Sequence, residues 1–215
     1  MQLWGFRNKT PHIPSSAELA AVRPLVGYRN LIVDAPHHTI RFARAGMEID
    51  LGGIAKGFAV EVAANVLRRR GLTGFIDAGG NQYMLGTPPG KQSWTVGIKN
   101  PDAADRLIGV VDVKSGSVST SADYENFLVA GGRTYGHLLD PRTRQPSTAS
   151  LSATIVAEDG TLADAMSKAA FILGPQQGIA LIDATPGMAG VIAYRRPDGS
   201  VGVAVSQRIA WRRVR

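Results

Sequence analysis

The alternation of apolar and polar positions predicts short strands interrupted by helical stretches. Helices are expected from Ile54 to Arg70, from Thr161 to Leu173 and from Gln176 to Ala184, with Gly71 and Gly174–Pro175 as breaks. The chain shows hairpins and no βαβ series, so the predicted class is α+β, with largely antiparallel sheets packed against two to three helices. Runs rich in β-branched and aromatic residues are predicted as strands at 31–33, 39–42, 75–77, 83–85, 94–98, 110–113, 118–120, 151–157, 191–194 and 201–205.

Three local features of the helices can also be predicted. A short capped helix is expected around Ser15–Leu19. Thr161, with Asp164 three residues later, fits a capping box, which would explain Asp164 without any function. The helix over 54–70 is expected to bury one apolar side, made of Ala55, Phe58, Ala59, Val62, Ala63, Val66 and Leu67.

Composition is ordinary for a globular protein. The 215 residues are 44% hydrophobic and 19% charged, enough to bury a full core. No apolar run approaches the roughly 18 residues that span a bilayer, and the N-terminus lacks the apolar core of a signal peptide. The absence of cysteine excludes disulfides, thiolate catalysis and cysteine metal sites.

The net charge is +7, from 24 Lys and Arg against 17 Asp and Glu. Much of the excess lies in Arg68–Arg70 and in residues 208–215. A nucleic-acid surface would interleave such residues with aromatics on one face. A solvated helix end and a basic tail explain them better, so no nucleic-acid partner is predicted. The charge alone favours anionic substrates or membrane surfaces.

The segment from Glu48 to Val60 carries the most informative motif, in which Asp50 precedes the pair Gly52–Gly53 and Lys56 follows. Paired glycines let a backbone approach a ligand closely, and the helix start behind them offers amide N–H groups to a phosphate. Lys56 adds a cation, so the segment predicts a pyrophosphate or nucleotide site. It matches neither a P-loop nor a Rossmann turn. The alternative is a tight strand-to-helix turn with a surface lysine.

Four further motifs follow in order: Ile76–Asn81, Ser119–Glu125, Tyr135–Thr143 and Ala163–Ser167. Each has a functional and a structural interpretation. The glycine pair before Asn81 gives either a second close backbone approach or a plain hairpin turn. The hydroxyls of the second motif contact either phosphate or solvent. A single histidine in the third is either catalytic or structural.

Together these five motifs resemble the ApbE family of FAD:protein FMN transferases over roughly residues 45–194, and residues 3–29 look like the region before the family's glycine turn. The resemblance implies transfer of FMN from FAD to a Thr or Ser hydroxyl of an acceptor protein, with release of AMP and dependence on Mg²⁺. It also implies a division into an N-terminal remnant (1–44), a flavin-transferase core (45–207) and a basic tail (208–215).

The resemblance assigns roles to individual residues. Catalysis falls to His137, Asp164 and Lys56, with either His137 or Asp164 as the base. Gly136 replaces the serine usual before that histidine. Metal ligands are the Gly53 carbonyl, Asp164, Ser167 and the position of Lys168. The FAD-binding residues implied are Asp50, Lys56, Gly79, Gly80, His137 and Leu139.

Lys168 departs from the family, which usually has threonine there. An ammonium offers a cation no lone pair, and Asp164 and Lys168 are spaced i, i+4 for an ion pair on one helical face. Three outcomes are open. The lysine swings away and leaves Mg²⁺ with Asp164 and backbone oxygens, its ammonium replaces part of the metal charge, or the site is inactive. We expect weakened but retained Mg²⁺ binding, sensitive to EDTA.

Family members usually carry a further N-terminal segment that contributes FAD contacts and often a lipoprotein signal, and this chain is expected to lack it. The alternatives are therefore an FAD-binding homologue without transferase activity and an FAD pyrophosphatase that releases FMN and AMP. The resemblance implies the bacterial periplasm, close to the inner membrane, if a signal precedes residue 1.

Overall fold

The computed structural model describes residues 1–123 and 127–214, and the chain divides into two compact units. The smaller unit contains Met1–Asp50 and Asn126–Ser147, and the larger contains Leu51–Glu125 and Thr148–Arg215. The first limit therefore falls at 50/51, compared with the 44/45 expected from the sequence. Of the predicted motifs, Tyr124 and Glu125 lie outside the described residues.

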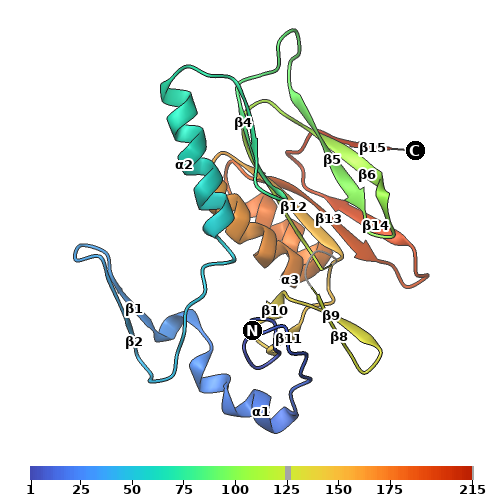
Figure 1. The fold of residues 1–215 in the computed structure, drawn as a ribbon. Helices are drawn as coiled ribbons and strands as arrows, with labels where there is room; N and C mark the ends of the chain where they lie inside the picture. The colour runs from blue at the N-terminus through green and yellow to red at the C-terminus, as the bar shows by residue number, and fades with distance from the viewer. Residues whose placement is uncertain (124–126, 215) are drawn as a thin grey trace. The chain divides into compact units, whose positions relative to one another are not determined.

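The smaller unit is built from short helices and two-stranded hairpins (Figure 1). The predicted short capped helix is present and begins with a capping box, in which Ser15 and Glu18 each bond the other's backbone N–H. The predicted strand pair 31–33 and 39–42 is confirmed as the antiparallel hairpin β1–β2. Its elements are α1 (Ser16–Ala21), η1 (Arg23–Leu25), η2 (Tyr28–Asn30), β1 (Leu31–Asp34), β2 (Thr39–Phe42), β8 (Phe127–Ala130), β9 (Arg133–Gly136), β10 (Leu139–Asp140) and β11 (Gln145–Pro146).

A buried tryptophan joins the two sequence segments of this unit. The indole Nε1 of Trp4 donates to the carbonyl oxygen of Arg144 at 2.9 Å. Its ring lies 5.5 Å from the ring of Tyr135, centroid to centroid. A tryptophan that is 5% exposed and has its N–H satisfied is a strong anchor, so the N-terminal segment is held to the region that carries the histidine motif.

The larger unit has three layers: two helices, a six-stranded sheet and a three-stranded sheet (Figure 1). The sheets have the orders β14-β13-β12-β7-β4-β3 and β15-β6-β5, and every pairing is antiparallel, as predicted for α+β. The elements are α2 (Ala55–Arg69), β3 (Gly74–Asp77), β4 (Asn81–Leu85), β5 (Trp94–Asn100), β6 (Ala103–Val113), β7 (Gly116–Ala122), β12 (Ser152–Ala157), α3 (Gly160–Ala184), β13 (Ala189–Arg195), β14 (Val201–Val205) and β15 (Trp211–Arg213).

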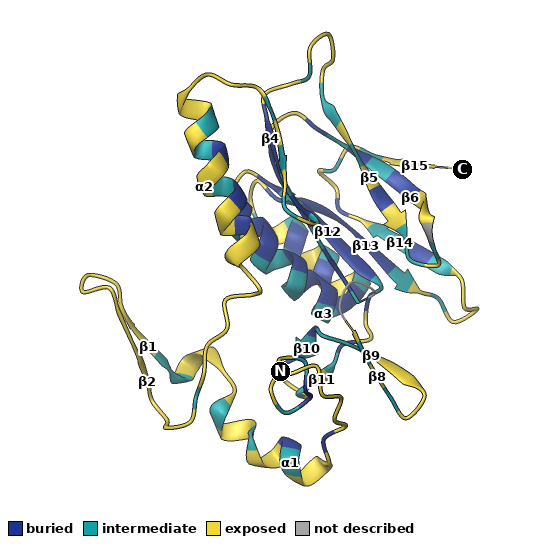
Figure 2. Ribbon diagram, in the orientation of Figure 1, coloured by how far each residue is buried: buried dark blue, intermediate teal, exposed yellow. Residues whose placement is uncertain are grey.

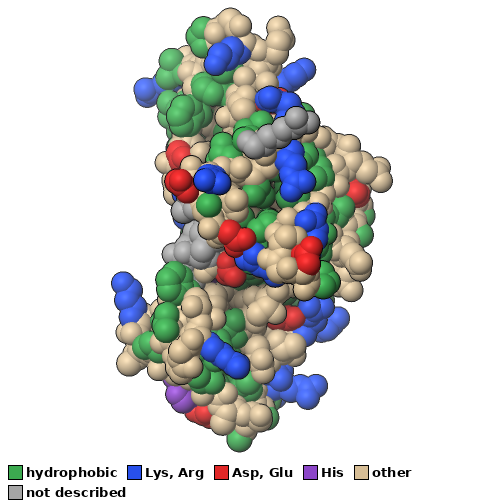
Figure 3. Space-filling view, turned by 90° about the vertical axis from the view of Figure 1, so that its right-hand side faces the viewer, with side chains coloured by type: hydrophobic (Ala, Val, Ile, Leu, Met, Phe, Trp, Pro, Cys, Tyr) green, Lys and Arg blue, Asp and Glu red, His purple; other side chains and the backbone are tan. Residues whose placement is uncertain are grey.

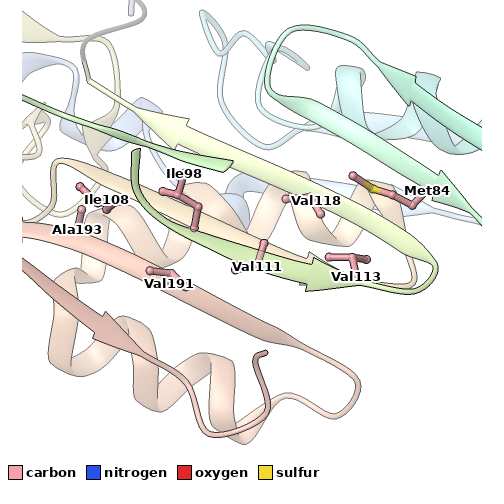
Figure 4. Close-up of a cluster of buried hydrophobic side chains, with 8 residues drawn as sticks. All are labelled: Met84, Ile98, Ile108, Val111, Val113, Val118, Val191 and Ala193. Atoms are coloured by element: carbon pink, nitrogen blue, oxygen red, sulfur yellow. The ribbon is translucent and has the colours of Figure 1, made fainter. Parts of the chain in front are cut away.

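Two hydrophobic clusters hold these layers together, and the buried residues concentrate on β12, β13 and the inner side of α3 (Figure 2). One cluster fills the space between the sheets (Figure 4). The other lies under α2 and contains Val60, Ala64, Tyr83 and Leu85. The members of the first cluster are Met84, Ile98, Ile108, Val111, Val113, Val118, Val191 and Ala193.

Strand β7 presents different chemistry to its two faces. Successive side chains of a strand point to opposite faces, and Val118 joins the cluster between the sheets. Ser119 and Ser121 point the other way and contact residues of α3. A row of buried hydroxyls therefore lies under α3, in the centre of the six-stranded sheet.

The buried face of α2 differs from the prediction. Gly57, Val60 and Ala64 are buried, whereas Phe58 and Val62 are 59% and 47% exposed. The expectation that the large apolar side chains face inward was wrong. Small residues occupy the inner face because α2 packs against a second helix and the sheet at close range.

The start of α3 also differs from the prediction. Asp159 is the N-cap and its carboxylate accepts from the N–H of Leu162 at 2.7 Å. Thr161 lies inside the helix and donates its hydroxyl to Glu61 of α2. The capping-box interpretation of Asp164 was therefore wrong. The predicted break at Gly174 is present as a kink, with φ +80°.

Residues 208–215, predicted as a basic tail, make specific contacts. The Arg208 guanidinium donates to the carbonyls of Ile182, Asp183 and Thr185 at the end of α3. Trp211–Arg213 add a strand to β6. On the face shown in Figure 3, lysine and arginine side chains are spread among hydrophobic and acidic ones. Among the described residues, no helix combines the length and hydropathy of a membrane span.

Candidate functional site

Asp164, in the second turn of α3, is the centre of a buried polar cluster in the larger unit. Its side chain has no exposed surface. Oδ2 accepts the backbone N–H of Gly57 at 2.8 Å, and Oδ1 forms an ion pair with the ammonium of Lys168 one turn later. A buried carboxylate requires such partners, because an unpaired charge in the interior is costly.

Two glycines let the start of α2 reach this carboxylate. A Cβ on Gly57 would lie 2.2 Å from the carbonyl oxygen of Gly160 and 2.5 Å from the Cβ of Asp164. A Cβ on Gly160 would in turn lie 2.8 Å from the carbonyl oxygen of Gly57. The two helices therefore meet backbone to backbone, and this contact places the Gly57 N–H on Asp164.

Hydroxyl and amide groups complete the cluster from the sheet side. Ser119 Oγ donates to Asp164 Oδ1 at 3.4 Å, and Ser121 Oγ lies 2.7 Å from Ser167 Oγ. The Asn81 amide satisfies all its neighbours when its nitrogen donates to Asp164 Oδ1 (3.1 Å) and to Ser119 Oγ (2.7 Å). The residues that surround Asp164 here are all buried, namely Asn81, Ser119, Ser121 and Ser167.

Lys56 links this cluster to the second double-glycine turn. Its ammonium donates to the carbonyl of Gly79 at 3.1 Å and lies 3.3 Å from the Asn81 side-chain oxygen in the same amide orientation. Gly79 and Gly80 have φ of +60° and +85°, values that favour glycine. The turn between β3 and β4 is thus fixed beside a cation, as a phosphate-binding loop requires.

A cavity of about 420 Å³ opens on the other side of this turn. It lies between the end of the six-stranded sheet and strand β5, with charged groups from Asp77 and Lys99. Gly79 lines the cavity and also accepts from Lys56. The cavity and the Asp164 cluster therefore share one loop. The lining residues are Asp77, Gly79, Gly80, Gln82, Val96, Gly97, Ile98, Lys99, Val118 and Thr120.

The structure brings together the predicted residues Lys56, Gly79, Asp164, Ser167 and Lys168. The others lie elsewhere. Gly80 follows Gly79 in the same turn, and Gly53 is exposed in the turn before α2. Asp50, His137 and Leu139 belong to the smaller unit. Their convergence with the Asp164 cluster stays a prediction.

In the smaller unit, the motif around His137 ends in a rigid turn. The Arg142 guanidinium donates to both carboxylate oxygens of Asp140, and its backbone N–H donates to Oδ1 at 2.8 Å. These bonds, above all those from the guanidinium, hold the pKa of Asp140 below its ordinary value. The pair fixes the loop between β10 and β11, directly after Leu139.

This pair predicts a pH-dependent contribution to stability. Because the folded-state pKa of Asp140 is lowered, its carboxylate stabilises the fold above the unfolded pKa of about 3.9, and the contribution is lost as pH falls through the folded pKa. Arg142→Ala should lower the free energy of unfolding slightly at neutral pH, because it removes the partner of the Asp140 carboxylate. Thermal unfolding should show the difference from wild type shrinking in acid, whereas the exposed Arg41→Ala should show no such trend.

Sequence reasoning missed one member of the cluster, Asn81, and a neighbouring contact between α2 and α3 made by Glu61. Glu61 accepts from both the N–H and the hydroxyl of Thr161. Asn81 could have been found because it directly follows the glycine pair of a predicted site turn. Glu61 carries no such signal, because a glutamate within a helix is ordinarily on the surface.

Comparison with known proteins decides the family. The sequence pattern of the ApbE family matches residues 1–192. The chain belongs to the ApbE family. Among curated relatives of this ApbE chain, the FAD:protein FMN transferase of Treponema pallidum is 35% identical over 190 residues, which cover 82% of this chain and 52% of the relative. The FAD:protein FMN transferase of Klebsiella pneumoniae is 32% identical, with 85% and 57% covered.

Solved structures show that the fold is that of the ApbE family. The ApbE protein of Thermotoga maritima superposes with a TM-score of 0.83 at 35% identity, covering 94% of this chain and 66% of its own. The apo flavinyl transferase ApbE of Pseudomonas stutzeri gives 0.78 at 29%, with 96% and 64% covered. This ApbE chain thus spans little more than half the length of the curated relatives it matches.

The Mg²⁺ that the resemblance implies does not fit the donors of this ApbE chain as they are arranged. Both oxygens of Asp164 already accept hydrogen bonds, and Lys168 supplies a positive charge at the carboxylate. The Ser167 hydroxyl donates to the Asp164 carbonyl at 2.8 Å. Across the described residues, no three His, Cys, Asp or Glu side chains gather as a metal site. A hard divalent cation needs about six oxygen ligands.

Proposed function

We propose that this chain transfers FMN from FAD to a Thr or Ser hydroxyl of an acceptor protein and releases AMP. The observation that carries the proposal is the meeting of Lys56, Lys168 and the Gly79–Gly80 turn around Asp164. Two ammonium groups beside a glycine turn suit a diphosphate, which is the group cleaved in this reaction. Membership of a family whose curated relatives are FAD:protein FMN transferases supports the same conclusion.

The reaction requires charge neutralisation and positioning more than covalent help from the protein. The acceptor oxygen forms a bond to the phosphorus on the FMN side. The bond from that phosphorus to the bridging oxygen breaks, and AMP leaves with the bridging oxygen and its electron pair. Lys56, at the start of α2, is placed to stabilise charge on the phosphate oxygens.

The acceptor hydroxyl loses its proton to a base. Asp164 is poorly suited to this role, because hydrogen bonds occupy both of its oxygens and it has no exposed surface. His137 is the other candidate from the sequence. We assign it the base role in the proposal, since a neutral imidazole nitrogen can accept a proton near neutral pH.

The finer parts of the proposal rest on the resemblance. These are the Thr or Ser acceptor and a periplasmic location near the inner membrane. The resemblance also implies Mg²⁺ dependence. The donor arrangement around Asp164 disfavours that dependence, so no step above is routed through a metal ion.

The test is to incubate the chain with FAD and a protein that a relative flavinylates, then follow AMP and the in-gel fluorescence of protein-bound flavin. Transfer predicts both signals together. AMP with free FMN and no labelled protein would indicate an FAD pyrophosphatase, and retained FAD without AMP would indicate a binding protein.

A matched pair of variants tests the role of Lys56. Lys56→Ala should lower the rate of AMP release by about tenfold or more, because it removes a cation from the phosphates. Lys114→Ala removes an equally exposed lysine between β6 and β7 and should leave the rate unchanged. Equal rates for the two variants would show that Lys56 does not act on the substrate.

A further inference from the structure

We propose that Lys168 is a resident counter-ion that closes Asp164 to divalent metal ions, so that the site neutralises phosphate charge with the ammonium groups of the chain itself. Sequence alone left three outcomes open for this lysine, namely displacement by a metal, substitution for its charge, or an inactive site. The geometry around Asp164 points to the second.

The first observation is that the ammonium is already in place. Lys168 forms its ion pair with Asp164 Oδ1 within one helical face, and its side chain is one-fifth exposed, whereas Asp164 has no exposed surface. A metal ion would have to displace the ammonium and leave it partly buried without this carboxylate. That exchange is unfavourable, because it loses the ion pair and leaves a partly desolvated charge.

The second observation is that the remaining oxygen ligands are engaged. Asp164 Oδ2 accepts the Gly57 N–H in a contact fixed by the crossing of α2 and α3. The hydroxyl of Ser167 donates to the Asp164 carbonyl and also contacts the hydroxyl of Ser121. Direct metal coordination would have to compete with these bonds, and the described residues hold no group of three His, Cys, Asp or Glu side chains that could supply the remaining ligands.

The third observation is that two ammonium groups flank the one carboxylate at the centre of the cluster. Asp164 contributes one negative charge, while Lys56 and Lys168 contribute one positive charge each. Asn81 links the two ammonium groups, because its oxygen lies 3.3 Å from Lys56 Nζ and its nitrogen donates to the carboxylate that holds Lys168. Such a cluster attracts an anion and repels a divalent cation.

The role of this charge in binding FAD rests on the proposed function, but the exclusion of metal does not. The first measurement is therefore a titration of the full chain with Mn²⁺, followed by the EPR signal of the free ion. Wild type should show no Mn²⁺ site that has a dissociation constant below about 1 mM and is lost on substitution of Asp164. Lys168→Thr, which adds a hydroxyl ligand and removes the ammonium, should bind Mn²⁺ at least about tenfold more tightly, and adding Asp164→Asn should abolish that gain.

The wild-type arm is decisive even if Lys168→Thr does not fold, because it needs only the comparison with Asp164→Asn. A site tighter than about 1 mM in wild type that Asp164→Asn removes would overturn the proposal. So would a folded Lys168→Thr variant that binds Mn²⁺ no better than wild type.

The second measurement is FAD binding in excess EDTA, followed by the quenching of flavin fluorescence. Wild type should bind FAD equally with EDTA or Mg²⁺, and Lys168→Met should weaken binding by about tenfold. Binding that requires Mg²⁺ would overturn the counter-ion role. No binding of FAD under either condition would refute the proposed function instead, and the Mn²⁺ titration would still decide the exclusion of metal.

Discussion

Gly57→Ala should lower the free energy of unfolding by about 3 kcal/mol, at the upper end of the range for an added methyl group in a packed interior. The new Cβ would lie 2.2 Å from the Gly160 carbonyl oxygen and 2.5 Å from the Cβ of Asp164. Neither atom belongs to a flexible side-chain end, so the two helices must separate. Urea unfolding followed by circular dichroism measures the effect.

The same substitution should also weaken FAD binding, because the Gly57 N–H moves away from Asp164 and the start of α2 carries Lys56 with it. Gly53→Ala is the matched control. A Cβ there meets no atom within 4 Å, and its backbone is outside the left-handed region. The control should change stability by less than about 0.5 kcal/mol. Equal stability of the two variants would mean that the helices do not meet at Gly57.

Sequence patterns predicted those parts of the fold that local physics determines. The hairpins β1–β2 and β13–β14 were found because each alternates around a turn of Pro, Asp, Gly or His. The hairpin β10–β11 was missed because each strand has only two residues and no alternation to read. Strand β15 was missed because its basic residues resemble a tail, yet Arg212 pairs with Asp112 on the neighbouring strand.

The inner face of α2 shows the limit of hydrophobic periodicity. The predicted apolar side included Phe58, Val62 and Val66, all of which are exposed. The chain instead buries Gly57, Val60 and Ala64, and at Gly57 the contact with Gly160 of α3 leaves no room for a side chain. A single sequence gives no information on the distance between α2 and α3. The helical periodicity of α2 was therefore predicted correctly, but the side that faces inward was not.

In the candidate site, too, contacts within one helix could be predicted from the sequence, whereas contacts between distant elements could not. The Asp164–Lys168 pair is four residues apart in one helix, and its spacing alone predicted it. The bonds from Gly57 and Ser119 to Asp164 span 107 and 45 residues. They depend on how α2 and β7 pack against α3, which no local pattern encodes.

That buried pair gives the other large expected effect. Asp164→Asn should lower the free energy of unfolding by about 3 kcal/mol, because it keeps the size of the side chain but leaves the partly buried Lys168 ammonium without its counter-charge. Lys168→Met removes the opposite partner and should cost about 2 kcal/mol, since Gly57, Ser119 and Asn81 still donate to the carboxylate.

The double variant Asp164→Asn/Lys168→Met should be about as stable as Asp164→Asn alone although it carries a second substitution, because it removes both charges and leaves an amide that can accept the Gly57 N–H. The three variants and wild type form a double-mutant cycle, for which we expect a coupling energy of about 2 kcal/mol from urea unfolding. Additive effects would show that the two charges do not interact, and Lys168 would then lie away from the carboxylate in solution. A coupling of this size would instead mean that any cation competing for Asp164 must first break an interaction worth about 30-fold in affinity.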